Sequence, residues 1–375
     1  MVPGNCRTEV RGRSSQENST AIDNDTIFLR NCWYVAAWDH ELIDGTKLAR
    51  TILEKPVVIY QGESGQVVAL DDRCCHRGAP LSMGRIEGDC IRCMYHGMKF
   101  EPSGRCIQIP GQDVIPAKLG VRSYPVVTRD HLIWIWMGDA DKADPSQIVD
   151  YEPLHDPAWK GMLAYMHYDA NWLLIVDNLS DFAHLAFVHT KTLGGFEEYA
   201  YQTKPLNIER LPDGFRVERW HMNSDPPPFH RKVIADKTAK VDRRNIGHMK
   251  VPGIFFLESM FAPAGSGAEK GNIAGARQYR NCQFMTRETR RTTHFFWNYL
   301  HNFDLDDPNI ALSLCNSLRE GFMEDKAIIE AQQKLFDREP DTTLLAIAAD
   351  APLAHFRRVF GQRLAAQQED LARAA

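Results

Sequence analysis

The sequence lacks any long apolar run. Across its 375 residues, no stretch approaches the roughly 18 consecutive apolar residues of a membrane-spanning helix, and the first 28 residues contain no signal-peptide core. It also lacks a strong charge, because 44 basic and 49 acidic residues leave a formal net charge of -5. We therefore expect a cytoplasmic protein with neither a membrane nor a nucleic acid as partner.

The sequence also lacks an even set of cysteines and any internal repeat. Nine cysteines do not suit a disulfide framework, and four of them fall between residues 74 and 93. In a reducing compartment, cysteines clustered in this way more often hold a metal. The chain is too long for one ordinary core, so we expect two domains.

Turn-forming residues and composition divide the chain into a flexible arm, a small β domain, an acidic and proline-containing linker, and an α+β domain: 1–28, 29–140, 141–160 and 161–375. Short apolar runs predict strands in the β domain: PVVIY, QVVAL, RCIQI and LIWIWM. The last domain is predicted to contain helices near 171–188 and after Pro308, and strands around 205–220, 253–262, 278–285 and 293–300. Helices segregated from a strand-rich sheet indicate an α+β fold.

Two cysteine and histidine pairs stand out in the β domain. They are Cys74-x-His76 and Cys93-x-x-His96, with sixteen residues between them. Two thiolates and two imidazoles could hold tetrahedral zinc, and Cys90-x-x-Cys93 alone is similar to half of a zinc ribbon. A zinc ribbon needs a second pair of the same kind. The nearest other cysteines are the adjacent Cys74 and Cys75, which cannot both point inward. Zinc is therefore the poorer interpretation.

A second candidate site lies in NWLLIVDNLSDFAHLAFVHT, residues 171–190. In this apolar helix Asn178, Asp181 and His184 recur at i+3 steps, so they are expected on one stripe. A buried carboxylate beside an imidazole is costly unless a partner or a metal is nearby. His189 can join His184 on one ion if the helix ends or bulges between them, and we predict such a distortion near Phe187.

Two histidines require a third ligand for the facial triad of a non-haem Fe(II) site. Asp325 falls on the apolar stripe of the helix that follows Pro308, whereas Glu324 and Asp306 fall off it. We therefore predict Asp325 as the third ligand and expect Glu324 and Asp306 to be solvated acids.

Together these residues resemble the Rieske non-haem iron oxygenases. The likeness covers roughly residues 30–340, with C-x-H followed by HRGAPLS, C-x-x-H followed by Gly97, and N-x-x-D-x-x-H-x-x-x-x-H plus a distant aspartate. It implies an all-β [2Fe-2S] domain, followed by a helix-grip (START-like) domain with a mononuclear Fe(II). One departure is Cys75, which stands where the family usually has proline and could perturb the cluster.

The resemblance also assigns roles to residues. Cys74 and Cys93 would bind one iron of the cluster, and His76 and His96 the other. A head-to-tail homotrimer is implied, in which Asp181 accepts hydrogen bonds from His184 of its own chain and from His96 of the next chain. Electrons would cross this bridge, and Asn178 would support it.

The resemblance is to vanillate and dicamba O-demethylases and related N-dealkylases, which implies O2-dependent hydroxylation of a carbon next to oxygen or nitrogen. The sequence has no G-x-G-x-x-G fingerprint and no ferredoxin cysteine run, so we expect a separate ferredoxin, flavin reductase or both as electron donor. Residues 253–261 (GIFFLESMF) and 281–286 (NCQFMT) are expected to line the pocket, including Leu257 and Gln283. Since they contain no arginine or lysine, we expect a neutral aromatic substrate.

Three alternatives stay open on the sequence alone. Aromatic ring cis-dihydroxylation uses the same iron ligands. An electron-transfer Rieske protein would need the cluster but not the second site, and a zinc-stabilised binding module would need neither iron.

Overall fold

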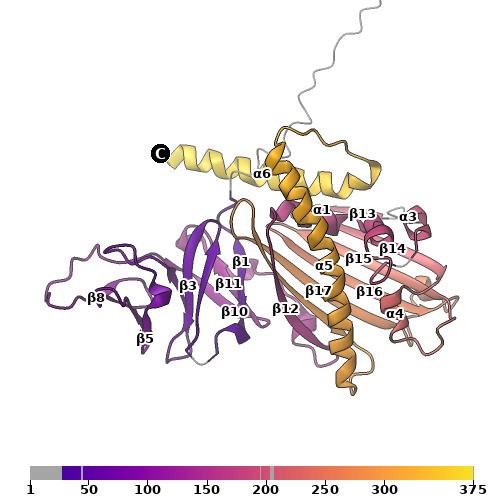
Figure 1. Cartoon of the computed structure of the whole chain (residues 1–375), viewed down its shortest axis with the longest axis horizontal. Helices are drawn as coiled ribbons and strands as arrows, with labels where there is room; N and C mark the ends of the chain where they lie inside the picture. The colour runs from indigo at the N-terminus through magenta and orange to yellow at the C-terminus, as the bar shows by residue number, and fades with distance from the viewer. Residues whose placement is uncertain (1–27, 44, 195, 203–206, 375) are drawn as a thin grey trace, which may run out of the picture.

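The computed structural model describes residues 28–43, 45–194, 196–202 and 207–374. The predicted arm falls outside these residues, except for Phe28. A β domain and a sheet-and-helix domain lie side by side in Figure 1. No helix in the described ranges has the length and apolar character needed to cross a membrane.

The β domain is built from short strands in three small antiparallel sheets, as the sequence predicts. Their orders are β1-β11-β10, β2-β3-β4-β9 and β5-β6-β7-β8. The strands are β1 (Trp33–Trp38), β2 (Lys47–Ile52), β3 (Lys55–Gln61), β4 (Val67–Asp71), β5 (Arg85–Glu87), β6 (Cys90–Arg92), β7 (Lys99–Phe100), β8 (Cys106–Gln108), β9 (Ser123–Tyr124), β10 (Val126–Arg129) and β11 (Leu132–Trp136).

The second domain is a seven-stranded antiparallel sheet of order β12-β18-β17-β16-β15-β14-β13. Its strands are β12 (Lys160–Tyr168), β13 (Asn207–Leu211), β14 (Gly214–Ser224), β15 (Val241–Lys250), β16 (Ile254–Pro263), β17 (Arg277–Arg287) and β18 (Thr293–His301). The helices are α1 (Trp172–Ser180), α2 (Leu185–Val188), α3 (Glu198–Gln202), α4 (Pro228–Arg231), α5 (Pro308–Arg338) and α6 (Ala351–Ala374). The α+β class predicted from the sequence is confirmed.

Side-chain alternation gives the large sheet two different faces. On the inner face, Phe255 and Trp297 belong to the core that also contains Phe322 of α5. On the outer face, Phe284 and Phe296 share a core with the tryptophans of the β domain. That second core includes Trp33, Trp38, Trp134, Trp136, Ile148, Tyr151, Ile254, Cys282 and Leu300. The outer face therefore joins the two domains, and the inner face is left for the helices.

The C-terminal helix α6 fixes the position of α1. The rings of Trp172 and Phe360 lie 5.0 Å apart, and Trp172 is also 6.0 Å from the ring of Phe356. The Asp177 carboxylate of α1 pairs with Arg357 of α6 at 2.6 Å. Figure 1 shows α6 lying across the end of the sheet, beside α1. Since α1 leads directly into the residues of the candidate site, this packing sets where those residues lie.

Replacing Phe360 by alanine is expected to lower the free energy of unfolding by about 3–5 kcal/mol, because it empties a fully enclosed aromatic site. Phe360 is 3% exposed. Leu371→Ala, on the same helix but 51% exposed, is the matched control and should change stability by less than about 0.5 kcal/mol. Urea unfolding of both variants measures the difference. Equal midpoints would show that α6 does not stabilise the domain.

Candidate active site

The first site is formed by two loops with the same backbone pattern. In one, the Cys74 amide donates to Ala79 and the Gly78 amide donates to the Cys74 carbonyl, at 2.8 and 2.9 Å. In the other, the Cys93 amide donates to Met98 and the Gly97 amide to Cys93, at 2.8 and 3.0 Å. Gly78 and Gly97 have φ of 69° and 75°, a conformation that favours glycine. The two predicted ligand pairs therefore lie on matching turns.

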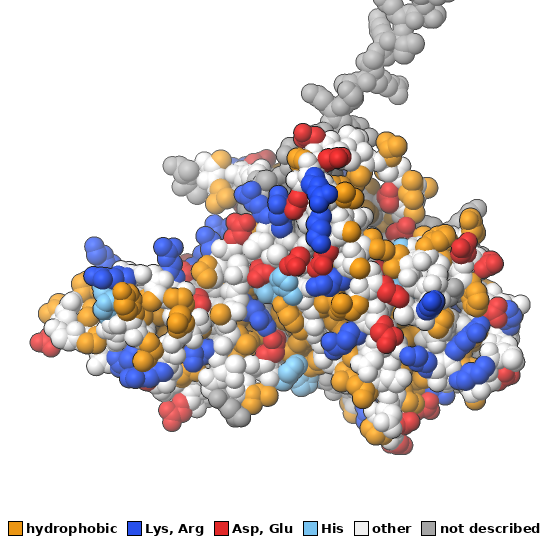
Figure 2. Space-filling view, in the orientation of Figure 1, with side chains coloured by type: hydrophobic (Ala, Val, Ile, Leu, Met, Phe, Trp, Pro, Cys, Tyr) orange, Lys and Arg blue, Asp and Glu red, His pale blue; other side chains and the backbone are white. Residues whose placement is uncertain are grey.

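The four predicted ligands meet between these turns. Cys74 and Cys93 are buried, and their thiols interact with each other, whereas His76 and His96 are exposed with ring centroids 4.6 Å apart. Burial raises the pKa of the Cys74 thiol to about 11. A thiolate there would need a metal, so the donor set fits a cluster held by two sulfurs inside and two imidazoles outside. Figure 2 shows histidine at the surface of this end of the molecule, beside hydrophobic side chains.

Cys75 is exposed, unlike its buried neighbour Cys74. Burial is the largest cause of the raised pKa of the Cys75 thiol. The Cys74 thiol, in contrast, is buried and interacts with the thiol of Cys93, the other predicted sulfur ligand. Cys74 therefore occupies the inward position that the C-x-H spacing assigns to it.

The segment that carries the second site is not one helix. Helix α1 ends at Ser180, and Asp181 is extended, with φ -122° and ψ 112°. A 3-10 turn over Phe182–His184 and the short α2 follow, and His189 comes directly after α2. The end of α2 at Val188 confirms the distortion predicted near Phe187. A second break, at Asp181, was not predicted. The expectation of one continuous stripe was wrong, because the extended Asp181 interrupts the helical periodicity.

This break positions His184 through the backbone. Its Nδ1 donates to the carbonyl oxygen of Asp181 at 2.5 Å, while the Asp181 carboxylate accepts from the Ala183 amide at 2.8 Å. The sequence predicted instead that the carboxylate would accept from His184. The Asp181 side chain is needed as the cap of the 3-10 turn, so its backbone does the orienting. Nε2 of His184 lies on the side of Asn178 and Asp325, 3.4 Å from Nδ2 of Asn178.

His184, His189 and Asp325 converge, as predicted from the sequence. Their ligand atoms lie within 4.8 Å of one another, and Oδ1 of Asp325 is 3.1 Å from Nε2 of His189 and 3.5 Å from Nε2 of His184. His189 is fully buried and Asp325 is 4% exposed. Asn178 donates from Nδ2 to the same Asp325 oxygen at 2.9 Å. Two imidazoles and one carboxylate in this arrangement fit a facial Fe(II) site.

Glu324 is not the solvated acid that the sequence predicted. Its carboxylate lies 2.7 Å from Nδ1 of His189 and accepts from the Thr192 hydroxyl at 2.6 Å. This contact fixes Nδ1 as the protonated nitrogen, so the unprotonated Nε2, which lies 3.1 Å from Oδ1 of Asp325, can bind a metal. The prediction was wrong because it considered only the apolar stripe of α5. Residues 189–194 fold back over the side of α5 that carries Glu324 and give it partners there.

The two imidazoles differ electrostatically. Burial lowers the pKa of His184, against a smaller opposing effect of Asp325. Burial also disfavours the charged form of His189, but Asp325 and Glu324 outweigh it and raise its pKa. Fe(II) would replace the proton as the positive charge between these carboxylates.

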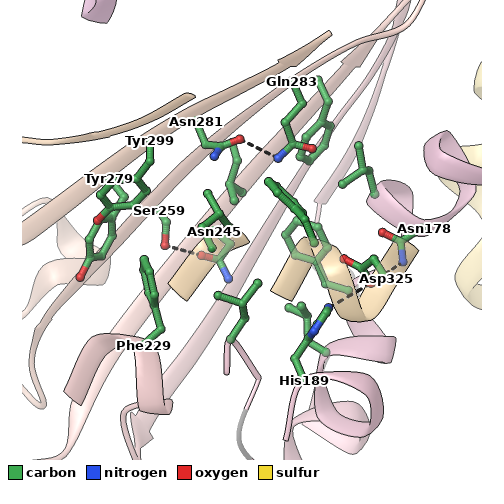
Figure 3. Close-up of a pocket in the computed structure, with 18 of the residues that line it drawn as sticks. Asn178, His189, Phe229, Asn245, Ser259, Tyr279, Asn281, Gln283, Tyr299 and Asp325 are labelled. Carbon is green, nitrogen blue, oxygen red and sulfur yellow. Dashed lines mark hydrogen bonds and ion pairs between the residues drawn. The ribbon is translucent and has the colours of Figure 1, made fainter. Parts of the chain in front are cut away.

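A cavity of about 820 Å³, its open mouth included, joins the triad to the inner face of the sheet. Most of its lining is apolar or aromatic: Leu179, Phe182, Leu185, Leu193, Phe229, Phe255, Leu257, Tyr279, Tyr299, Leu318 and Phe322. Figure 3 shows His189, Asp325 and Asn178 on one side of the cavity and the two tyrosines and Phe229 on the other. The cavity has the size and lining of a pocket for an aromatic compound.

Neutral polar groups on the sheet line the same cavity. Ser259 donates to the Asn245 side chain at 2.7 Å, and Gln283 donates to that of Asn281 at 2.6 Å (Figure 3). Oε1 of Gln283 is buried without a partner among the described residues. Leu257 and Gln283, the two predicted pocket residues, both lie in the lining.

Arg243 also lines the cavity, and the sequence did not predict it. It lies on β15, a strand whose sequence VDRRNIGHMK was not recognised because it contains few β-branched residues and many charges. Alternation along the strand could have revealed it, because Arg243, Asn245 and Gly247, each two residues apart, lie on the side of the sheet that faces the cavity. Residues 253–261 and 281–286 indeed lack arginine and lysine, but they are not the whole wall of the cavity. The premise of a neutral substrate was therefore incomplete.

Comparisons with known proteins agree with both sites. Residues 32–125 match the Rieske [2Fe-2S] domain, and residues 168–366 match the vanillate O-demethylase oxygenase C-terminal domain. The chain is 45% identical over 345 residues to the toluene-4-sulfonate monooxygenase system iron-sulfur subunit of Comamonas testosteroni, covering 91% of this chain and 98% of that one. It is 35% identical over 317 residues to the oxygenase component of dicamba O-demethylase from Stenotrophomonas maltophilia, covering 82% and 88%. The crystal structure of dicamba monooxygenase bound to dicamba superposes with a TM-score of 0.81 at 30% identity, covering 91% and 99%.

Proposed function

Since the chain belongs to the Rieske-type oxygenase components with a vanillate O-demethylase catalytic domain, we propose that it hydroxylates an alkyl carbon on a substituted aromatic ring. The observation that carries the proposal is the cavity in which His184, His189 and Asp325 face an aromatic-lined space. An electron-transfer protein would have no use for this cavity.

The reaction consumes O2, two electrons and two protons, and it converts an alkyl C-H bond to C-OH with release of water. On an O-methyl or N-alkyl group the product is a hemiacetal or hemiaminal, which falls apart to an aldehyde and a phenol or an amine. On a ring methyl group the product is a benzylic alcohol. The named relatives, a toluene-4-sulfonate monooxygenase and a dicamba O-demethylase, support the same hydroxylation reaction at either a ring methyl carbon or an O-methyl carbon.

The bound cofactors supply the redox chemistry: the [2Fe-2S] cluster provides single electrons and the Fe(II) activates O2. The chain provides the geometry. Glu324 and the Asp181 carbonyl fix the two imidazoles, and Asn178 holds the Asp325 carboxylate. The apolar walls exclude water, and the unpartnered Oε1 of Gln283 offers one acceptor with which to orient a substrate.

As an oxygenase component, the chain receives its electrons from a separate donor protein. A ferredoxin, a flavin reductase or both fit this role. The cluster loops, around β5 to β8, lie at one end of the molecule, whereas α5, which carries Asp325, belongs to the other domain (Figure 1). This arrangement supports electron transfer between neighbouring chains of a homotrimer. In that arrangement Asp181 connects His184 of one chain to His96 of the next.

Asp181→Asn is expected to stop turnover while leaving the metals bound. Asparagine caps a helical turn about as well as aspartate, and the backbone contact to His184 does not depend on the side chain. The lost negative charge should weaken the bridge between chains, so product formation should fall by about 100-fold or more. Iron content and the cluster absorbance are the controls. Normal turnover would refute the bridge.

Product analysis tests the proposed function directly. The oxygenase, a surrogate reductase and NADH are incubated with O-methyl, N-alkyl and ring-methyl aromatics, and the products are separated by mass. Formaldehyde with a phenol or an amine, or a benzylic alcohol, is the expected result. A cis-diol would assign ring dihydroxylation instead, and no oxygenated product from any compound would overturn the proposal.

A further inference from the structure

We infer that the pocket binds an aromatic substrate through an anionic head group, a sulfonate or a carboxylate, held by Arg243 at the end of the cavity where β14 and β15 meet. The inference rests on the proposed function, because it names the substrate class of the same cavity. It replaces the neutral substrate expected from the sequence.

The register of two strands gathers the groups that would hold the anion. Arg219 and His221 of β14 lie directly opposite Asn245 and Arg243 of β15. Because residues two apart on a strand share a face, all four side chains lie on the inner face of the sheet. All four are buried, with exposures of 5%, 3%, 8% and 5% in that order. Their positions follow from strand pairing rather than from a flexible loop.

This group is continuous with the cavity that contains the iron ligands. Arg243 and Asn245 line that cavity together with His184, His189 and Asp325. The same two residues line a smaller recess with Arg219 and His221. Figure 3 shows Asn245 with its partner Ser259 across the cavity from Asp325. A head group at β15 would therefore leave the rest of the ring directed toward the metal.

Two guanidinium groups on adjacent strands of one buried face are unfavourable unless negative charge is nearby. The carboxylate that acts on Arg219 is that of Asp181, and Nε of Arg219 has no hydrogen-bond partner among the described residues. Among the described residues that line the cavity, Asp325 supplies the one carboxylate, and it is assigned to the metal. An anionic head group bound beside Arg243 would bring negative charge to this end of the cavity.

The neighbouring histidines do not add to this charge. Burial, then Arg243 and Arg219, lowers the pKa of His221 to about 3. Burial and Arg243 also keep the pKa of His230 well below its usual value. Both imidazoles are therefore neutral at pH 7, and the recognition of an anion falls to the guanidinium groups, whose planar donors match carboxylate and sulfonate oxygens.

Equilibrium binding to the iron-loaded oxygenase tests the inference without turnover. The probes are two matched pairs: toluene-4-sulfonate with its neutral amide toluene-4-sulfonamide, and 4-methoxybenzoate with 4-methoxybenzamide. Isothermal titration calorimetry should show that at least one anion binds about 10-fold or more tightly than its amide. The pair with the larger ratio identifies the head group. Equal affinities within both pairs would overturn the inference.

The Arg243→Gln variant locates the contact. It should weaken binding of the preferred anion by about 30-fold or more and change binding of the amide by less than about threefold. Arg244→Gln is the matched control, because Arg244 is the next residue on β15, points to the outer face and lies over the Trp220 ring. It should change neither affinity. Equal losses for anion and amide in Arg243→Gln would assign Arg243 to packing and overturn the inference.

Failure of this inference and failure of the proposed function are distinguishable. If anions bind through Arg243 but no compound is oxygenated, the inference stands and the function falls. If neutral ethers are demethylated and the anions show no preference in binding, the function stands and the inference falls. Should Arg243→Gln not fold, the comparison of anion with amide on the unchanged enzyme still decides.

Discussion

Asp325→Ala is expected to remove the mononuclear iron and reduce product formation by more than about 1000-fold. The variant leaves two imidazoles without the carboxylate that lies 3.1 Å from His189 and 3.5 Å from His184. Metal content should fall from about three irons per chain to about two, since the cluster accounts for two. The visible spectrum of the cluster should be unchanged, because its loops lie in the other domain.

Asp306→Ala is the matched control for this loss. Asp306 is an exposed acid just before α5, and the sequence had identified it as solvated. Its replacement should leave three irons and full turnover. If Asp325→Ala retained its third iron, or lost the cluster as well, the assignment of the facial site would be wrong.

Glu324→Ala is expected to weaken binding of the mononuclear iron by about 10- to 100-fold, a typical effect of removing a carboxylate that orients a ligand histidine. Without its 2.7 Å contact to Glu324, His189 loses the group that holds its Nδ1 proton and fixes its ring. Iron affinity is measured by competition with a chelator, and turnover is then measured at saturating iron. Saturation should restore much of the activity, since no ligand is lost.

Two further variants sharpen that experiment. Glu324→Gln keeps the shape of the side chain and one acceptor oxygen, so its loss should be smaller than that of the alanine variant. Glu320→Ala removes an exposed acid one turn earlier on α5 and should have no effect. Unchanged iron affinity in Glu324→Ala would mean that the Thr192 loop, rather than Glu324, positions His189.

The candidate metal ligands were predictable because their chemistry is unusual in its surroundings. Cysteine and histidine at fixed short spacings, and an acid on the apolar stripe of α5, stand out against any plausible structural role. The structure brings His184, His189 and Asp325 together as expected. Residue type and spacing sufficed because a metal site needs few atoms in a narrow range of geometry.

What the sequence could not show depends on where the chain turns. Asp181 leaves the helix, and this moves the hydrogen bond of His184 from a carboxylate to a carbonyl oxygen. Glu324 became a partner of His189 because a distant loop covers it. Arg243 was missed because its strand, β15, was missed. That strand is mostly buried but rich in charged residues, so its composition differs from that of an ordinary buried strand. Each case is a tertiary contact that local pattern does not encode.

The tryptophan-rich core between the β domain and the outer face of the large sheet has a practical consequence. Trp134 of one domain packs against Phe284 of the other, with ring centroids 5.3 Å apart. Recombinant fragments cut between the domains would each expose half of this apolar surface to water, a recognised cause of aggregation. Work on the isolated cluster domain should therefore begin by redesigning that surface with polar residues, not merely by choosing where to cut.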